Sequence, residues 1–105
     1  MKIVGVTSCV SGLAHTPMAA AALTKAGKAM GIDIKIEQQG AMGFVDELSQ
    51  KEVDESDVVI FAVDRAIEKE ERFEGKRIVK VKLGQCISSA EVILTKIKEK
   101  VQNEG

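Results

Sequence analysis

The chain has 105 residues, of which 45% are hydrophobic and 30% charged, a balance typical of a globular domain rather than a disordered segment. Its net charge of −1 comes from basic and acidic residues mixed along the sequence, which excludes the clustered basic surface that nucleic-acid binding needs. No apolar run is long enough to cross a bilayer or to act as a secretory signal. We therefore expect one cytoplasmic domain over residues 1–105, with no direct membrane insertion.

Four short runs have the composition of β-strands, at residues 2–7, 32–37, 58–63 and 77–82, and helical stretches alternate with them. The first and third runs are almost continuously apolar, as expected for strands buried on both faces of a sheet. The second and fourth alternate between apolar and charged residues, which is typical of half-exposed edge strands. With right-handed crossovers, this pattern predicts a four-stranded parallel sheet in the order 2-1-3-4, inside a three-layer α/β sandwich of the Rossmann-like kind.

The helix after the first strand has clear boundary signals. Thr16 is a candidate N-cap, Pro17 suits the first helical position and Gly31 suits the stop. Its small and apolar residues recur at helical spacing and allow a close approach to the sheet. Three further helices are expected, at residues 45–48, 66–72 and 89–101.

The turn between the first strand and the first helix carries the candidate chemistry. Ligands of such sheets bind beyond the carboxyl ends of the strands, at the point where the strand order reverses, and Cys9 lies there. A helix N-terminus offers free N–H groups and the positive end of a dipole, both of which favour a thiolate or a phosphoryl group. Small residues and hydroxyls in the same turn leave room for tetrahedral oxygens. We therefore predict that Cys9 forms a phosphocysteine, although a buried, inert cysteine is the simpler alternative.

The only histidine, His15, follows Cys9 by six positions. Low-molecular-weight tyrosine phosphatases carry Cys-x5-Arg-Ser/Thr in the same strand–loop–helix setting, and the Arg grips the phosphate in the transition state. Here His15 occupies the Arg position, so hydrolysis should be slow and a phosphocysteine should persist, as a phosphoryl carrier requires. A solvated histidine of the first helical turn is the alternative.

The other cysteine, Cys86, has no such setting, and we predict that it packs in the core. It is too far along the chain from Cys9 for a metal or redox motif, so we expect free thiols, no metal and no cofactor.

Together these residues resemble a known family. The stretch TSCVSGLAHT, followed by Met18-Ala19-Ala20, is similar to the phosphocysteine loop of the fructose-type enzyme IIB, a component of the bacterial phosphoenolpyruvate-dependent sugar phosphotransferase system. The similarity covers nearly the whole chain, and continues through residues 34–40, 57–60, 64 and 71–73.

The resemblance implies a defined reaction. In that family a phosphohistidine IIA protein or domain donates a phosphoryl group to the IIB cysteine, which passes it to a sugar, fructose by default, bound in the membrane permease IIC. The chain would then be a protein-phosphocysteine–sugar phosphotransferase. The phosphorylated cysteine corresponds to Cys9. The phosphate-binding loop corresponds to Val10, Ser11, Gly12, Leu13, Ala14, His15 and Thr16.

Two departures from the family pattern are visible. Val10 stands where the family more often has proline, and Pro17 where an aromatic residue is common. Because an apolar residue and a helix-starting residue are retained, the departures bear on sugar specificity more than on phosphoryl transfer.

Four further residues are candidates for the rim of the site: Gln39, Gly40, Asp64 and Arg72. Three of them have a structural alternative. Gly40 permits a turn, Asp64 could cap the next turn, and Arg72 could make a structural ion pair. For Asp64 and Arg72 we favour the structural interpretation.

Two other functional classes stay open at this point. One is a phosphatase-like hydrolase that uses Cys9, against which the missing Arg argues. The other is a module that binds phosphate or nucleotide without covalent chemistry, in which Ser could replace Cys9. No glycine-rich dinucleotide fingerprint follows the first strand.

Overall fold

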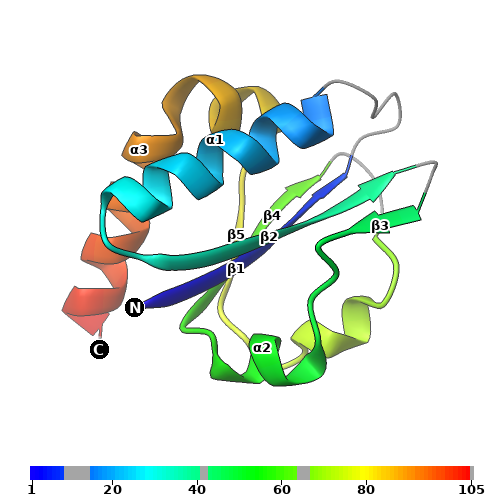
Figure 1. Ribbon diagram of the computed structural model, residues 1–105. Coiled ribbons are helices and arrows are strands. Elements are labelled where there is room, and N and C mark those ends of the chain that lie inside the picture. Colours follow the sequence, from blue (N-terminus) through cyan, green and yellow to red (C-terminus); the bar gives the residue numbers. More distant parts are fainter. Residues whose placement is uncertain (9–14, 41–42, 64–66, 105) are drawn as a thin grey trace.

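The computed structural model describes residues 1–8, 15–40, 43–63 and 67–104, and shows an α/β sandwich of three layers (Figure 1). A five-stranded sheet forms the middle layer, in the order β3-β2-β1-β4-β5. Helices α1 and α3 cover one face, and the short helix α2 and the 3₁₀ helix η1 cover the other. In chain order the elements are β1 (Lys2–Ser8), α1 (His15–Ala29), β2 (Asp33–Gly40), β3 (Gly43–Val45), α2 (Gln50–Glu55), β4 (Val58–Val63), η1 (Glu70–Phe73), β5 (Ile78–Lys80) and α3 (Leu83–Glu104).

The four predicted strands and their order are confirmed. Strands β2, β1, β4 and β5 pair in parallel, and β1 and β4 lie in the centre, where they bury nearly all their side chains. The central position follows from their apolar sequences, because both faces of these strands are covered. The carboxyl ends of β1 and β4 therefore lie side by side, with Ser8 opposite Val63.

The fifth strand, β3, is not predicted by the sequence pattern. It has three residues and pairs antiparallel with the end of β2, with Gly40 opposite Gly43. So short a segment carries too little alternation to be recognised as a strand. Strand β2 also extends to Gly40, three residues beyond its predicted end.

The helix predicted at residues 45–48 is wrong. Val45 ends β3, and Asp46 has a φ of +54°, which no regular helix contains. Helix α2 begins after Ser49 instead, with a capping box. The Ser49 hydroxyl accepts a hydrogen bond from the Glu52 N–H at 3.1 Å, and the Glu52 carboxylate accepts one from the Ser49 N–H at 2.9 Å.

The other helix boundaries also differ from the prediction. Helix α1 begins at His15, so Thr16 lies inside the first turn instead of capping it, whereas Gly31 follows the last turn as predicted, with a φ of +72°. Helix α3 begins at Leu83, and non-helical angles at Ser89 mark a kink where the predicted helix starts. The helix expected at residues 66–72 is only the 3₁₀ turn η1. Among the described helices, none combines the length and hydropathy needed to cross a membrane.

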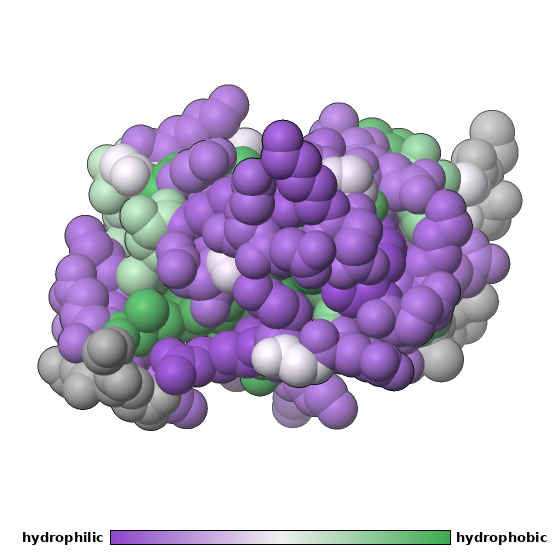
Figure 2. Space-filling model, turned by 90° about the horizontal axis from the view of Figure 1, so that it is seen from below, coloured by the Kyte–Doolittle hydropathy of each residue, from purple (hydrophilic) through white to green (hydrophobic). Residues whose placement is uncertain are grey.

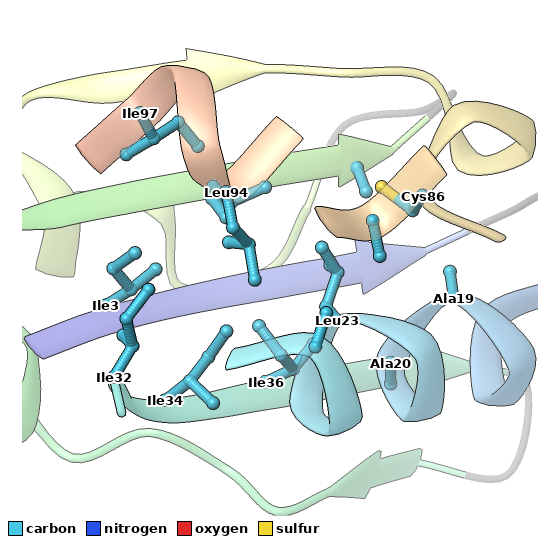
Figure 3. Close-up of a cluster of buried hydrophobic side chains, with 14 of the residues drawn as sticks. Ile3, Ala19, Ala20, Leu23, Ile32, Ile34, Ile36, Cys86, Leu94 and Ile97 are labelled. Carbon is cyan, nitrogen blue, oxygen red and sulfur yellow. The ribbon is translucent and has the colours of Figure 1, made fainter. Parts of the chain in front are cut away.

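The larger apolar core lies between the sheet and the pair α1 and α3 (Figure 3). Leu23 of α1, Ile36 of β2 and Leu94 of α3 project into it. Helix α1 approaches β2 closely because residue 27 is glycine. A Cβ added to Gly27 would lie 2.6 Å from Cγ2 and 3.1 Å from Cβ of Ile34.

We expect Gly27→Ala to lower the melting temperature, although alanine is the better helix former. The propensity gain is about 1 kcal/mol, whereas overpacking against a rigid strand costs about 1–3 kcal/mol. Gly84→Ala in α3 is the matched control, because a Cβ there meets nothing within 4 Å. It should leave the melting temperature unchanged or raise it. Thermal unfolding by circular dichroism would measure both, and an equal rise in both variants would contradict the close approach.

Candidate functional site

The segment that carries Cys9 joins the centre of the sheet to a helix N-terminus. Strand β1 ends at Ser8, and α1 begins at His15. In the register of the sheet, Ser8 lies between Gln39 of β2 and Val63 of β4, so residue 9 follows the middle of the carboxyl edge. This is the point where the strand order reverses, as the sequence predicts. The candidate residues Cys9, Val10, Ser11, Gly12, Leu13, Ala14 and Asp64 themselves lie outside the described part of the chain.

The first turn of α1 is tied to the sheet by a threonine hydroxyl. Thr7 is fully buried, and its Oγ1 lies 3.4 Å from the carbonyl oxygens of both Thr16 and Glu37, to which it can donate its one hydrogen. This contact links α1, β1 and β2 at the end where the candidate loop begins.

Thr16 itself holds an unusual polar group. Its side chain is 2% exposed, and its Oγ1 finds no hydrogen-bond partner among the described residues. A buried hydroxyl without a partner costs about 1–3 kcal/mol, so such groups are rare without a reason. The hydroxyl belongs to the first turn of a 15-residue helix, whose opening N–H groups have no partner within the helix.

A buried ion pair lies on the opposite face of β2. Glu37 is fully buried and Arg72 is 8% exposed, and their side chains meet through two hydrogen bonds, Nη1 to Oε1 at 2.7 Å and Nη2 to Oε2 at 2.9 Å. The alternation of residues 32–37 places Glu37 on the exposed face of an edge strand, and this expectation is wrong. The loops around α2 and η1 cover that face, and the surface they present outward is mostly hydrophilic (Figure 2).

Every N–H group of Arg72 is engaged. Nε donates to the carbonyl oxygen of Lys69 at 2.9 Å, Nη1 also donates to that of Leu48 at 2.7 Å, and Nη2 reaches that of Glu68 at 3.5 Å. The structural ion pair is therefore confirmed for Arg72. The guanidinium has no N–H left for a phosphoryl group, so the geometry gives no support to Arg72 as a rim residue.

Gln39 belongs to the same network. Its Nε2 donates to Oε2 of Glu37 at 2.8 Å and to the carbonyl oxygen of Glu68 at 3.0 Å, and its Oε1 accepts from the Glu68 N–H at 2.9 Å. Gly40, by contrast, is exposed at the end of β2, and space is open around its α-carbon. Sequence analysis singles out Gln39 as a rim candidate but misses its partner Glu37. The one sequence signal for Glu37 is that it is a charged residue on the other face of the strand from Ile34 and Ile36.

Burial has a strong effect on the pKa of two titratable groups, Glu37 and Cys86. Burial alone would raise the pKa of Glu37, but hydrogen bonds from Arg72, Gln39 and the Leu48 N–H outweigh it and hold this pKa below its ordinary value. The thiol of Cys86 has no such partners, and burial raises its pKa to about 11. Cys86 is fully buried in the core beside α1, as predicted for a packing residue.

We expect Glu37→Gln to lower the free energy of unfolding at neutral pH by about 3 kcal/mol or more, because it leaves the Arg72 charge buried without its counter-charge. The double variant Glu37→Leu/Arg72→Met should lose less, since no charge stays buried. Urea unfolding would measure both. A single variant that is more stable than the double variant would contradict this account.

The same pair predicts a pH dependence. A carboxyl group whose pKa is lowered by folding stabilises the folded state above its unfolded pKa, and this contribution is lost as the pH falls through the folded pKa. The wild type should therefore lose stability as the pH falls below about 4.3, the ordinary value of a glutamate. Glu37→Gln should lose less over the same range, and parallel pH profiles would refute the assignment.

Comparison with known proteins places this chain among phosphoryl-transfer components. Residues 4–102 match the family described as the lactose/cellobiose-specific IIB subunit of the PTS system. A PTS system fructose-like EIIB component 2 from Escherichia coli (strain K12) is 47% identical over 96 residues, which are 91% of each chain. The solution structure of an enzyme IIB subunit of the PTS system from Escherichia coli K12 is 36% identical, with a TM-score of 0.92 over 98% of this chain and 95% of that one.

Larger proteins contain a similar region. The PTS system fructose-specific EIIABC component of Bacillus subtilis (strain 168) is 38% identical over 95 residues, which are 90% of this chain but 15% of that protein. An arginine phosphatase resembles the chain in fold alone, at 10% identity and a TM-score of 0.57 over 97% of this chain and 96% of that one.

The chain is therefore a sugar phosphotransferase component, a transferase. It belongs to the IIB family of the phosphotransferase system and is of the fructose type. The predicted resemblance is confirmed. The phosphatase alternative is supported only by a distant structural neighbour. In relatives such as the EIIABC protein, the IIB region shares one polypeptide with A and C components, so IIB works together with IIA and IIC partners.

Proposed function

We propose that Cys9 carries the phosphoryl group in this IIB component. It accepts the group from a phosphohistidine of a IIA protein or domain and donates it to a sugar bound in the membrane permease IIC. The sugar is fructose, the substrate class in the names of several relatives. The transfer takes place in the cytoplasm, at the membrane surface where the permease lies.

The observation that carries this proposal is the position of residue 9. Its segment follows the end of the central strand β1 and precedes the N-terminus of α1, where free N–H groups and the helix dipole favour negative charge. The reactive form of a cysteine is the thiolate, which is an anion of the kind that such a helix terminus favours. The buried hydroxyl of Thr16, without a partner among the described residues, is available to donate to a phosphoryl oxygen.

The chemistry is two successive displacements at phosphorus. In the first, the Cys9 thiolate forms a P–S bond as the P–N bond of the phosphohistidine breaks. The phosphohistidine ring carries a proton on its other nitrogen, so it leaves as neutral imidazole. In the second, the P–S bond breaks as a sugar hydroxyl oxygen forms a P–O bond, and the hydroxyl proton passes to a base at the permease. The thiolate is regenerated, so the carrier turns over without a cofactor.

Several groups serve this reaction by neutralising the transferred phosphoryl group. They are the N–H groups of the helix N-terminus, the hydroxyls of Ser11 and Thr16, and His15 when it is protonated. His15 in place of an arginine provides a weaker grip on the transition state of hydrolysis. The phosphocysteine then survives until the acceptor arrives.

The wild type, incubated with phosphoenolpyruvate, the general phosphotransfer proteins and a fructose-type IIA protein, should gain the mass of one phosphoryl group. Cys9→Ser should gain none. Cys86→Ser is the matched control and should be phosphorylated as fully as the wild type, because the buried Cys86 thiol has a pKa of about 11 and stays protonated. Intact mass spectrometry under mild conditions would measure the mass gained by each of the three proteins. A phosphoryl group retained in Cys9→Ser, or mapped to His15, would refute Cys9 as the carrier.

We also expect hydrolysis of aryl phosphates far below a typical enzymatic turnover of about 10 per second. An arginine that stabilises a phosphoryl-transfer transition state contributes orders of magnitude in rate, and His15 stands in its place. Release of phosphate from a chromogenic aryl phosphate would measure this, with Cys9→Ser as the blank. Turnover at the typical rate that disappears in Cys9→Ser would favour the hydrolase instead.

A further inference from the structure

One amide side chain clamps a loop beside the candidate site. Gln39 is 6% exposed and bonds both main-chain polar groups of Glu68, donating to the carbonyl oxygen at 3.0 Å and accepting from the N–H at 2.9 Å. Glu68 follows β4 in the chain, yet it is held at β2, on the other side of the central strand β1. Residues 67–69, which we call the clamped segment, therefore lie at the same edge of the sheet as the end of β1.

The orientation of the amide is fixed by the buried ion pair. The second N–H of Gln39 donates to Oε2 of Glu37 at 2.8 Å, and that carboxylate is itself held by Arg72. The amide thus has its nitrogen between two acceptors and its oxygen against a donor, and the opposite orientation would set oxygen against oxygen. A side chain with all its polar atoms engaged in a buried network holds one position and does not exchange between several.

The clamped segment presents charge to solvent next to the strand ends. Glu68 and Lys69 are exposed, and Lys69 adopts a left-handed φ of +57°. Its ammonium group contacts the Glu47 carboxylate at 2.7 Å and lies 5.3 Å from the centre of the Phe44 ring in β3. Strand β3 and the clamped segment therefore form one continuous surface along the carboxyl edge.

We infer that Gln39 is a positioning residue, which holds the clamped segment where a phosphorylated IIA protein contacts it on its way to Cys9. The inference rests on the proposed function, because the donor must approach the carboxyl edge only if Cys9 receives the phosphoryl group. In this role Gln39 acts through Glu68, to which it is bonded by both its amide nitrogen and its amide oxygen.

A docking role and a stabilising role differ in kinetics. Docking contacts are made equally in the ground state and in the transition state, so their loss raises KM for the donor and leaves kcat nearly unchanged. Loss of stability alone reduces the fraction of folded carrier and lowers the apparent kcat at constant KM.

The test compares Gln39→Leu with Ser49→Ala. Leucine fills a similar volume without the amide, whereas Ser49→Ala removes the N-cap of α2 at a cost of about 1 kcal/mol and leaves the clamp intact. If Gln39→Leu fails to fold, Gln39→Asn, with its shorter side chain, replaces it. Two measurements are made, amide hydrogen exchange at Glu68 and the steady-state kinetics of phosphorylation by a phosphorylated fructose-type IIA protein.

In the Gln39 variant we expect exchange of the Glu68 N–H to accelerate about tenfold or more. We expect KM for the IIA donor to rise about fivefold or more, with kcat within about twofold of the wild type. Ser49→Ala should change neither. Unchanged Glu68 exchange, or faster exchange with the wild-type KM, would overturn the inference while the proposed function stands. Absence of phosphorylation on Cys9 in the wild type would overturn the proposed function, and the docking role with it.

Discussion

The carboxylate of Glu37 accepts four hydrogen bonds in a fully buried position, two from Arg72, one from Gln39 and one from the Leu48 N–H. A buried carboxylate is stable only when its partners replace water completely, and here each oxygen has two. The donors come from β2, from the turn before α2 and from η1. One charge on the sheet therefore fixes the course of two connections on this face, the one that leads into α2 and the one that contains η1.

This arrangement matters because the two faces of the sheet are built differently. The face under α1 and α3 has two long helices and an extended apolar core, which are enough to hold it together. The other face has a six-residue helix, a four-residue 3₁₀ turn and a smaller apolar cluster. Apolar burial is directionless, whereas hydrogen bonds specify which atoms meet. The polar network thus supplies the positional accuracy that short helices and few apolar contacts do not.

The sequence predicts the parallel sheet because strong physical signals act over whole segments. Residues 58–63 are apolar throughout, and that run requires cover on both faces wherever the strand lies. The signals that fail are local or depend on distant partners. Strand β3 forms because the chain folds back on β2. A segment of three residues is too short to show this pairing in its sequence pattern. The burial of Glu37 depends on Arg72, 35 positions away, and a charged residue on an alternating strand is otherwise expected in water. For the site, the place of the connection between β1 and α1 follows from strand order and helix position. The clamp at Gln39, in contrast, depends on side-chain contacts between segments far apart in the sequence.

The two outer strands of the sheet, β3 and β5, are each three residues long. A strand at the edge of a sheet has main-chain groups that can pair with the edge of another molecule, and long, flat edges promote such association. Here each edge offers few such groups, and β5 ends at the charged Lys80. Outer strands this short leave little main chain through which two copies of the chain could pair edge to edge.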